Sequence, residues 1–117
     1  MNVVVVKGVL SSPPVWRDLP SGSSAVALEV TTEDPDGSKC SVPVTMVDPR
    51  RPQDIDALTT GDEVAVIGHV RRRFFRTGSG TASRTEVVAD ELIRPTQRAR
   101  LQKSLVRVSE VIGSVES

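Results

Sequence analysis

The stretch RRRFFR, residues 71–76, combines the two side-chain types that bind nucleic acids, guanidinium groups and aromatic rings. Arginines neutralise phosphates, and a ring offers a flat apolar surface on which a base can stack. The chain holds one tryptophan and two phenylalanines, so two of its three aromatic residues lie beside its densest positive charge. Because a duplex hides the faces of its bases, this combination favours a single-stranded ligand.

The spacing within this stretch matters because successive side chains of a strand point to opposite faces. Arg71, Arg73 and Phe75 would share one face, in a row of about 13 Å at ~3.3 Å per residue. Of the adjacent Phe74 and Phe75, we expect one to lie in the core. The alternative interpretation is a basic strand that is merely solvated or protects a sheet edge.

No other cluster of residues predicts chemistry. His69 and Cys40 are the only histidine and cysteine, so no metal-ligand spacing exists, and we expect Cys40 to be a small core residue. The TGSGTAS segment lacks the lysine of a phosphate-binding loop. No nucleophile with a base partner is visible. We therefore expect no enzyme activity, no metal, no cofactor and no small-molecule substrate.

The composition bounds the class of protein. A chain of 117 residues is the size of one domain, and its formal net charge of +0 means that attraction to a polyanion must come from local clustering. A single cysteine and the absence of a targeting segment indicate a reducing, cytoplasmic location. The longest apolar run, residues 3–6, is far below the ~20 residues that span a bilayer, so we expect no membrane association.

Periodicity predicts a small all-β protein. Alternation and β-branched runs predict five strands, and a helix is expected at residues 49–60 between the third and fourth of them. The predicted strands are residues 2–10, 25–32, 40–47, 63–75 and 83–93. Residues 11–24 are expected to form a long turn or ragged hairpin. This pattern favours a small closed antiparallel barrel, with an open sandwich as the alternative.

The composition changes from Pro95 onward, which divides the chain into a domain at residues 1–94 and a tail at residues 95–117. Apolar residues in the tail step by four, three, four and three, which is a heptad seam of about two heptads. They are Leu101, Leu105, Val108, Ile112 and Val115. Two interpretations stay open: a helix that joins subunits, or a helix that docks on its own barrel or frays.

Two stretches in order carry a family resemblance. The first is NVVVVKGVLSSPPVWRDLPSGSSAVALEVTT, and the second is GDEVAVIGHVRRRFF followed by SRTEVVAD. Together, over residues 2–94, they resemble the bacterial single-stranded DNA-binding protein family. The resemblance implies an oligonucleotide-binding (OB) barrel, assembled as a homo-oligomer (dimer or tetramer), that coats single-stranded DNA in replication, repair and recombination. We expect a chain with this role to be cytoplasmic and associated with the nucleoid.

The resemblance also assigns site residues. Arg71 and Arg73 match basic positions of the family's fourth strand, and Phe75 matches its base-stacking aromatic. The full set of expected nucleic-acid contacts is Arg71, Arg73, Arg76 and Arg84 on phosphates, Phe75 and Trp16 on bases, with Lys7 and Arg17 as lesser candidates.

The chain also departs from the family. Ser41 and Val47 stand where the family has stacking aromatics, the EDPDGSK loop is short, and the acidic C-terminal tip is missing. We therefore expect a divergent or paralogous member with weaker, more charge-dependent binding. The alternative is an OB-fold module for protein interaction or oligomerisation with weak or no DNA binding. RNA is an alternative ligand, because rings and arginines do not distinguish the 2′-hydroxyl.

Overall fold

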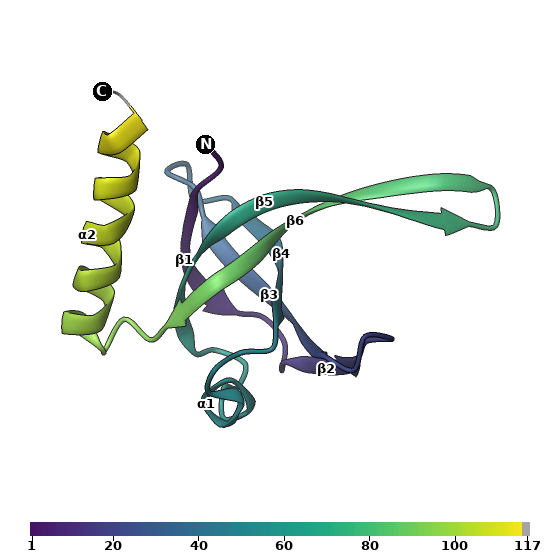
Figure 1. The fold of residues 1–117 in the computed structure, drawn as a ribbon, viewed down its shortest axis with the longest axis horizontal. Helices are drawn as coiled ribbons and strands as arrows, with labels where there is room; N and C mark the ends of the chain where they lie inside the picture. Colours follow the sequence, from purple (N-terminus) through teal and green to yellow (C-terminus); the bar gives the residue numbers. More distant parts are fainter. Residues whose placement is uncertain (116–117) are drawn as a thin grey trace.

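The computed structural model describes residues 1–115, with side chains up to residue 113. The chain is mostly β-structure, as the sequence predicts, with six strands and two helices (Figure 1). The strands are β1 (Val4–Leu10), β2 (Val15–Asp18), β3 (Ser24–Glu33), β4 (Lys39–Val47), β5 (Glu63–Thr77) and β6 (Gly80–Ile93). The helices are α1 (Pro52–Asp56) and α2 (Arg98–Val115).

The strands form one sheet that returns on itself. Its order is β1-β5-β6-β4-β3-β2, and β1 also pairs with β3 through Val9 and Leu10, so five strands close a ring with β2 outside it. All neighbours are antiparallel except β4 and β6, which pair in parallel at Val44 and Val87. The ring gives the molecule one interior.

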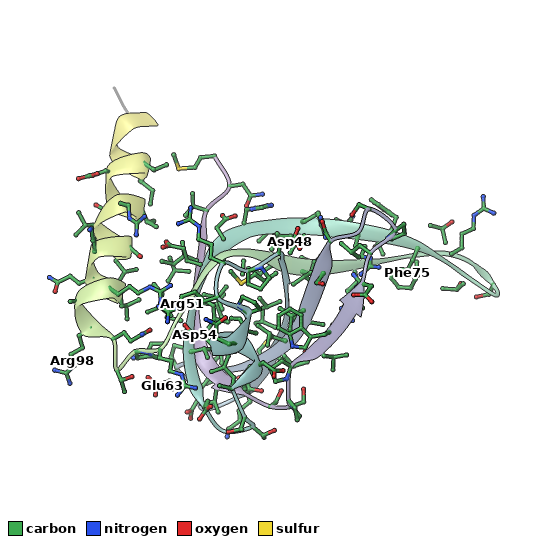
Figure 2. The ribbon with its side chains drawn as sticks, turned by 60° about the horizontal axis from the view of Figure 1, so that its bottom comes forward. Asp48, Arg51, Asp54, Glu63, Phe75 and Arg98 are labelled. Atoms are coloured by element: carbon green, nitrogen blue, oxygen red, sulfur yellow. The ribbon has the colours of Figure 1, made fainter. Side chains whose placement is uncertain are left out.

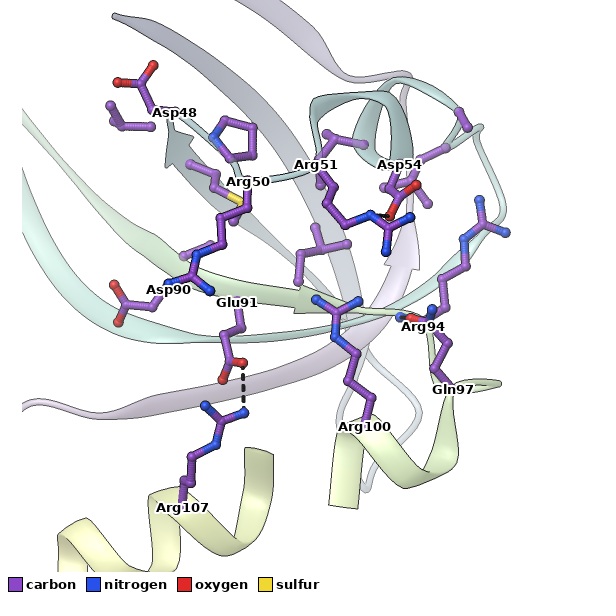
Figure 3. Close-up of a pocket in the computed structure, with 18 residues that line it drawn as sticks. Asp48, Arg50, Arg51, Asp54, Asp90, Glu91, Arg94, Gln97, Arg100 and Arg107 are labelled. Carbon is purple, nitrogen blue, oxygen red and sulfur yellow. Dashed lines mark hydrogen bonds and ion pairs between the residues drawn. The ribbon is translucent and has the colours of Figure 1, made fainter. Parts of the chain in front are cut away.

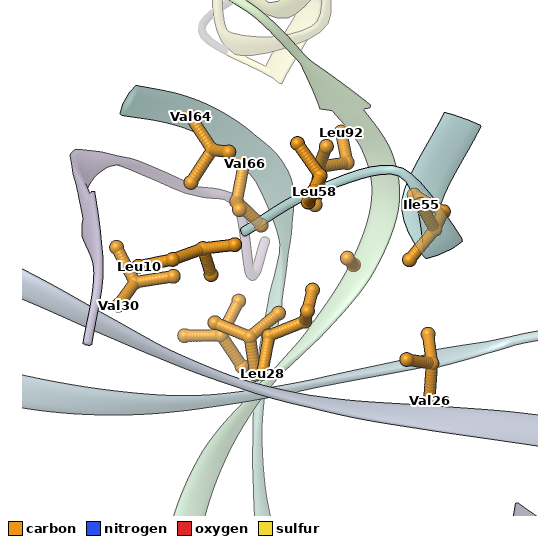
Figure 4. Packing of buried hydrophobic residues seen from close by; sticks show 12 residues of the cluster. Leu10, Val26, Leu28, Val30, Ile55, Leu58, Val64, Val66 and Leu92 are labelled. Atoms are coloured by element: carbon orange, nitrogen blue, oxygen red, sulfur yellow. The ribbon is translucent and has the colours of Figure 1, made fainter. Parts of the chain in front are cut away.

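The core fills this interior (Figure 4). In β3 the alternation that the sequence predicts is confirmed, because Val26, Leu28 and Val30 are buried. Ile55 of α1 and Leu58, which follows that helix, close one side of the same cluster. Burying apolar area of this kind is the main favourable contribution to folding, at ~25 cal/mol per Å².

Two expectations about the secondary structure need revision. Of the long turn or ragged hairpin expected at residues 11–24, the structure has the hairpin, and it contains a sixth strand that the sequence did not predict: Val15–Asp18 pairs with Ser24–Ala27 of β3, and the prolines around it flank the strand. The helix expected at residues 49–60 is shorter: it begins with Pro52 in its first turn and ends at Asp56. Pro52 has no N–H to donate, so the first turn is where a helix tolerates it.

Cys40 also differs from its expected core position, because it is exposed. The β3–β4 hairpin extends beyond the ring here, and its end residues Glu33 and Lys39 are exposed as well. The buried part of β4 is centred on Val44. Apolar alternation alone therefore placed the start of the buried segment too early in this strand.

Helix α2 lies beside the sheet (Figure 1) and contacts β6 through Glu91. The buried Ser104 donates its hydroxyl proton to Glu91 Oε1 at 3.1 Å, and Arg107 lies 3.2 Å from the same oxygen. Of the expected seam, Leu105 and Ile112 remain 40% and 45% exposed, and the Val115 side chain lies outside the described residues. Neither helix in the described part of the chain is long and apolar enough to cross a membrane.

Candidate nucleic-acid interface

The basic-aromatic stretch lies on a long two-stranded extension that we call the hairpin arm, residues 70–87. Here β5 and β6 pair without interruption from Val70↔Val87 to Thr77↔Gly80, and the ribbon extends away from the ring (Figure 1). The sequence predicts strands that end at residue 75 and resume at residue 83, but in the structure the two strands continue to Thr77 and Gly80. Residues 70–81 are all exposed.

Both phenylalanines of the arm face solvent. The exposed fraction is 66% for Phe74 and 43% for Phe75, and Figure 2 shows Phe75 on the arm. The expectation that one of them lies in the core was wrong. The cause is that β5 leaves the ring at about Val70, so neither face of the strand has an interior beyond that point. Two rings are therefore open to stacking.

The direction of the arm is set where β5 bends. The pairing of β5 with β6 shifts register between Ile67 and Gly68, and a shift of this kind bends and twists a strand. Gly68 is buried directly against the backbone of Val88, where a Cβ atom would not fit. Beyond Gly68 the register is regular, so side chains alternate along the arm.

This alternation gives two arm faces. The first arm face carries Arg71, Arg73 and Phe75, with Arg84 and Glu86 of β6 directly across. The second arm face is defined by residues 72, 74 and 76, which are Arg72, Phe74 and Arg76. Threonine and serine lie across from the second face.

The base of the first arm face is occupied by a buried carboxylate. Arg71 Nη2 donates to Glu86 Oε1 at 2.7 Å, and Thr45 Oγ1 donates to Glu86 Oε2 at 2.8 Å. The Glu86 side chain is only 5% exposed. Burial raises its pKa, but the hydrogen bonds from Arg71 and Thr45 and the charges of Arg71 and Arg73 outweigh burial and hold the pKa below its usual value. Glu86 thus links the arm to Thr45 of β4 in the ring, and Arg71 neutralises Glu86 within the arm.

Two further predicted phosphate ligands have carboxylate partners. Arg84 Nη2 lies 2.8 Å from Glu29 Oε1, and Ser41 Oγ donates to Glu29 Oε2 at 2.8 Å. Ser41 stands where the family resemblance would place a stacking aromatic, and here it positions the acid that neutralises Arg84. Lys7 lies 3.5 Å from Glu63. A phosphate would have to compete with these acids.

The remaining arginines of the arm are free of such partners. Among the described residues, no carboxylate forms a hydrogen bond or ion pair with Arg72, Arg73 or Arg76. On the second arm face Arg72 and Arg76 flank Phe74, the more exposed ring. Sequence reasoning named Arg73 and Arg76 but passed over Arg72 and Phe74. Both residues belong to the same RRRFFR stretch. They were left out because one phenylalanine was expected to lie in the core.

Trp16 and Arg17 lie on β2, which pairs with β3 and not with the arm. The indole of Trp16 is partly buried and packs against the core cluster. Only the part of the ring that does not contact the core is open to a base. Arg17 is exposed.

Neither comparison with known proteins returns a match. No protein-family model matches the chain, and no curated protein sequence does. Among the residues that the structure describes, no three His, Cys, Asp or Glu side chains are grouped to hold a metal ion.

Proposed function

We propose that this chain is an OB barrel that binds single-stranded DNA with little sequence preference, through the hairpin arm. The observation that carries this proposal is the exposure of two adjacent rings beside three arginines without carboxylate partners. The closed ring of five strands, with α1 between β4 and β5, is compatible with a five-stranded Greek-key barrel of the OB type.

In the proposed complex the two side-chain types act on different parts of the bound nucleic acid. Arg72, Arg73 and Arg76 each neutralise a phosphate, and Phe74 and Phe75 stack on bases, each for about 1 to 3 kcal/mol. Every base has a π-face, so stacking tolerates any sequence. Arg71 and Arg84 contribute less, because each would have to leave an acid. The role that follows is protection of single strands in replication, repair or recombination.

The test is the affinity for a labelled oligo-dT, measured by fluorescence anisotropy. Phe74→Ala and Phe75→Ala should each weaken binding about five- to hundredfold, which corresponds to the free energy of one stacked base. Because both rings are exposed, the melting temperature should stay unchanged. Val15→Ala is the matched control, since Val15 is 63% exposed on β2, away from the arm.

Two outcomes would contradict the proposal: no binding of oligo-dT by the unmodified chain at low salt, or an equal loss in Val15→Ala. Repeating the titration with oligo-rU separates DNA from RNA as the preferred ligand.

The alternative function, an interaction or oligomerisation module, is favoured by the exposed Leu105 and Ile112 of α2. The light-scattering mass of the same samples separates the two functions. An assembly larger than one chain, unchanged in Phe75→Ala and without affinity for oligo-dT, would establish the module.

A further inference from the structure

A second polar site lies away from the hairpin arm. A cavity of about 930 Å³ opens between α1, the ends of β4 and β6, and the start of α2 (Figure 3). No residue of the hairpin arm lines this cavity. Its wall contains one third of the basic residues of the chain, five arginines out of fifteen lysines and arginines. These are Arg50, Arg51, Arg94, Arg100 and Arg107.

Three of these arginines are neutralised within the protein. Each has a carboxylate at ion-pair distance, and two of the three acids also line the cavity. The pairs are Arg51 with Asp54 at 3.0 Å, Arg107 with Glu91 at 3.2 Å, and Arg94 with Asp62 at 3.7 Å.

Arg50 and Arg100 differ from these three, because neither guanidinium has a hydrogen bond or ion pair with any described residue. Arg50 follows β4 and Arg100 lies in the first turns of α2, so they approach from different elements, and both side chains reach into the cavity in Figure 3.

The two remaining acids of the lining, Asp48 and Asp90, form no ion pair with Arg50 or Arg100 within the described part of the chain. Asp48 accepts the Ser24 N–H at 2.9 Å, which together with the Ser23 side chain lowers the pKa of Asp48. Asp90 lies 3.8 Å from His69, and the two form an ion pair only when His69 is protonated. The guanidiniums of Arg50 and Arg100 are therefore available to bind the anionic groups of a ligand.

The rest of the lining decides which kind of anion fits. Apolar side chains make up much of the wall: Met46, Val47, Pro49, Ile55, Ala57, Leu58, Ala89 and Leu92. Val47 is 44% exposed, so part of this apolar surface is accessible. No aromatic residue lines the cavity, so a base would find no ring to stack on. A peptide that carries both carboxylates and aliphatic side chains matches both parts of the wall.

We propose that this cavity docks an acidic, aliphatic peptide segment of a partner protein, with carboxylates on Arg50 and Arg100 and an aliphatic side chain against Val47. Arginine binds carboxylates in a bidentate geometry, which gives such a site direction as well as affinity. This site is separate from the DNA-binding surface proposed above, and either can exist without the other.

The test uses a fluorescein-labelled peptide of four Asp-Leu repeats, with Ser-Leu and Asp-Ser repeats of equal length as controls. The full chain should bind the Asp-Leu peptide and neither control. Arg50→Glu and Arg100→Glu should each weaken binding at least tenfold. Arg98→Glu is the matched control, because this substitution changes the charge by the same amount as Arg100→Glu. Arg98 is exposed on α2, the helix that also carries Arg100, and it does not line the cavity (Figure 2).

Arg50→Gln and Arg100→Gln replace the glutamate variants if circular dichroism shows that those do not fold, with an expected loss of about tenfold each. The proposal is overturned if the unmodified chain does not bind the Asp-Leu peptide at low salt, or if Arg98→Glu loses as much affinity. It is also overturned if Arg50→Glu and Arg100→Glu impair oligo-dT binding and leave peptide binding intact, which would assign the cavity to nucleic acid.

Discussion

At the scale of single residues, Glu86 separates the arginines that build the arm from those that are free to bind. It is the one acidic residue that is buried in the part of the chain with described side chains, at 4% exposure. A buried carboxylate is costly unless it is paired and hydrogen-bonded. Arg71 and Thr45 meet this need, so Arg71 contributes first to stability and only second to any ligand.

This arrangement predicts a pH-dependent stability. Because the folded-state pKa of Glu86 lies below its unfolded value of about 4.5, its contribution is fully present above that pH and is lost as the pH falls through the folded pKa. Glu86→Gln should lower the free energy of unfolding at pH 7 by about 1.5–3 kcal/mol, the range of a charge-assisted hydrogen bond. It should also reduce the loss of stability between pH 6 and pH 3. Urea unfolding across this range measures both.

The exposed Glu110 supplies the control, since Glu110→Gln should follow the pH dependence of the unmodified chain. An identical acid profile for Glu86→Gln would show that the buried pair does not govern acid stability.

Residue types and spacing were enough to single out the basic-aromatic stretch, but not to say which of its arginines are free. Glu29 lies 55 positions before Arg84 in the sequence, and the two meet only because β3, β4 and β6 are neighbours in the sheet. A contact of this kind depends on the closed strand order, which hydrophobic alternation does not encode.

At the scale of elements, the bend of β5 at Gly68 determines where the arm points. A Cβ atom at this position would overlap the carbonyl oxygen of Val88, and backbone cannot rotate away as a side chain can. Gly68→Ala should therefore destabilise the protein by about 1–3 kcal/mol or more, the cost of overpacking a tight contact. Urea unfolding measures this loss, and oligo-dT titration tests whether the arm still binds.

Gly78→Ala is the matched control, because it lies at the tip of the arm and its Cβ would meet no atom within 4 Å. It should change stability by less than about 1 kcal/mol. Equal effects of the two substitutions would mean that the close contact between Gly68 and Val88 does not determine the direction of the arm.

Element lengths were the least predictable feature of the fold. Periodicity found the five strands that form the ring, since each contributes apolar side chains to the core. It missed β2, a strand of four residues held by pairing to β3, because nearby prolines dominate the local pattern. It also predicted strand ends that are too early, because the glycines, serines and threonines of residues 77–83 are typical of a loop. In the structure most of these residues belong to β5 or β6 and pair across the two strands.

At the scale of the whole molecule, charge is separated although its sum is +0. The arm extends from one side of the ring, and α2 lies on another side (Figure 1). The arm carries arginines without acidic partners, while many acids elsewhere are already paired, as Glu29, Glu63 and Glu91 show. Association with a polyanion therefore depends on this local cluster and not on net charge.

The salt dependence of binding counts the charges that this cluster supplies. Each phosphate contact to a single strand contributes about 0.7 to the slope of log affinity against log salt concentration. Three unpaired arginines on the arm therefore predict a slope of about −2, and Arg73→Ala should reduce it to about −1.4. Oligo-dT titrations at several salt concentrations measure both slopes.

Arg98→Ala removes an equally exposed arginine far along the chain from the arm, and it should leave the slope of about −2 unchanged. A slope near −3.5 would mean that Arg71 and Arg84 exchange Glu86 and Glu29 for phosphates, since two more contacts would then be counted. A slope near zero, or one that Arg73→Ala does not alter, would contradict phosphate binding by the arm. Any affinity that then remained would have to come from the rings alone.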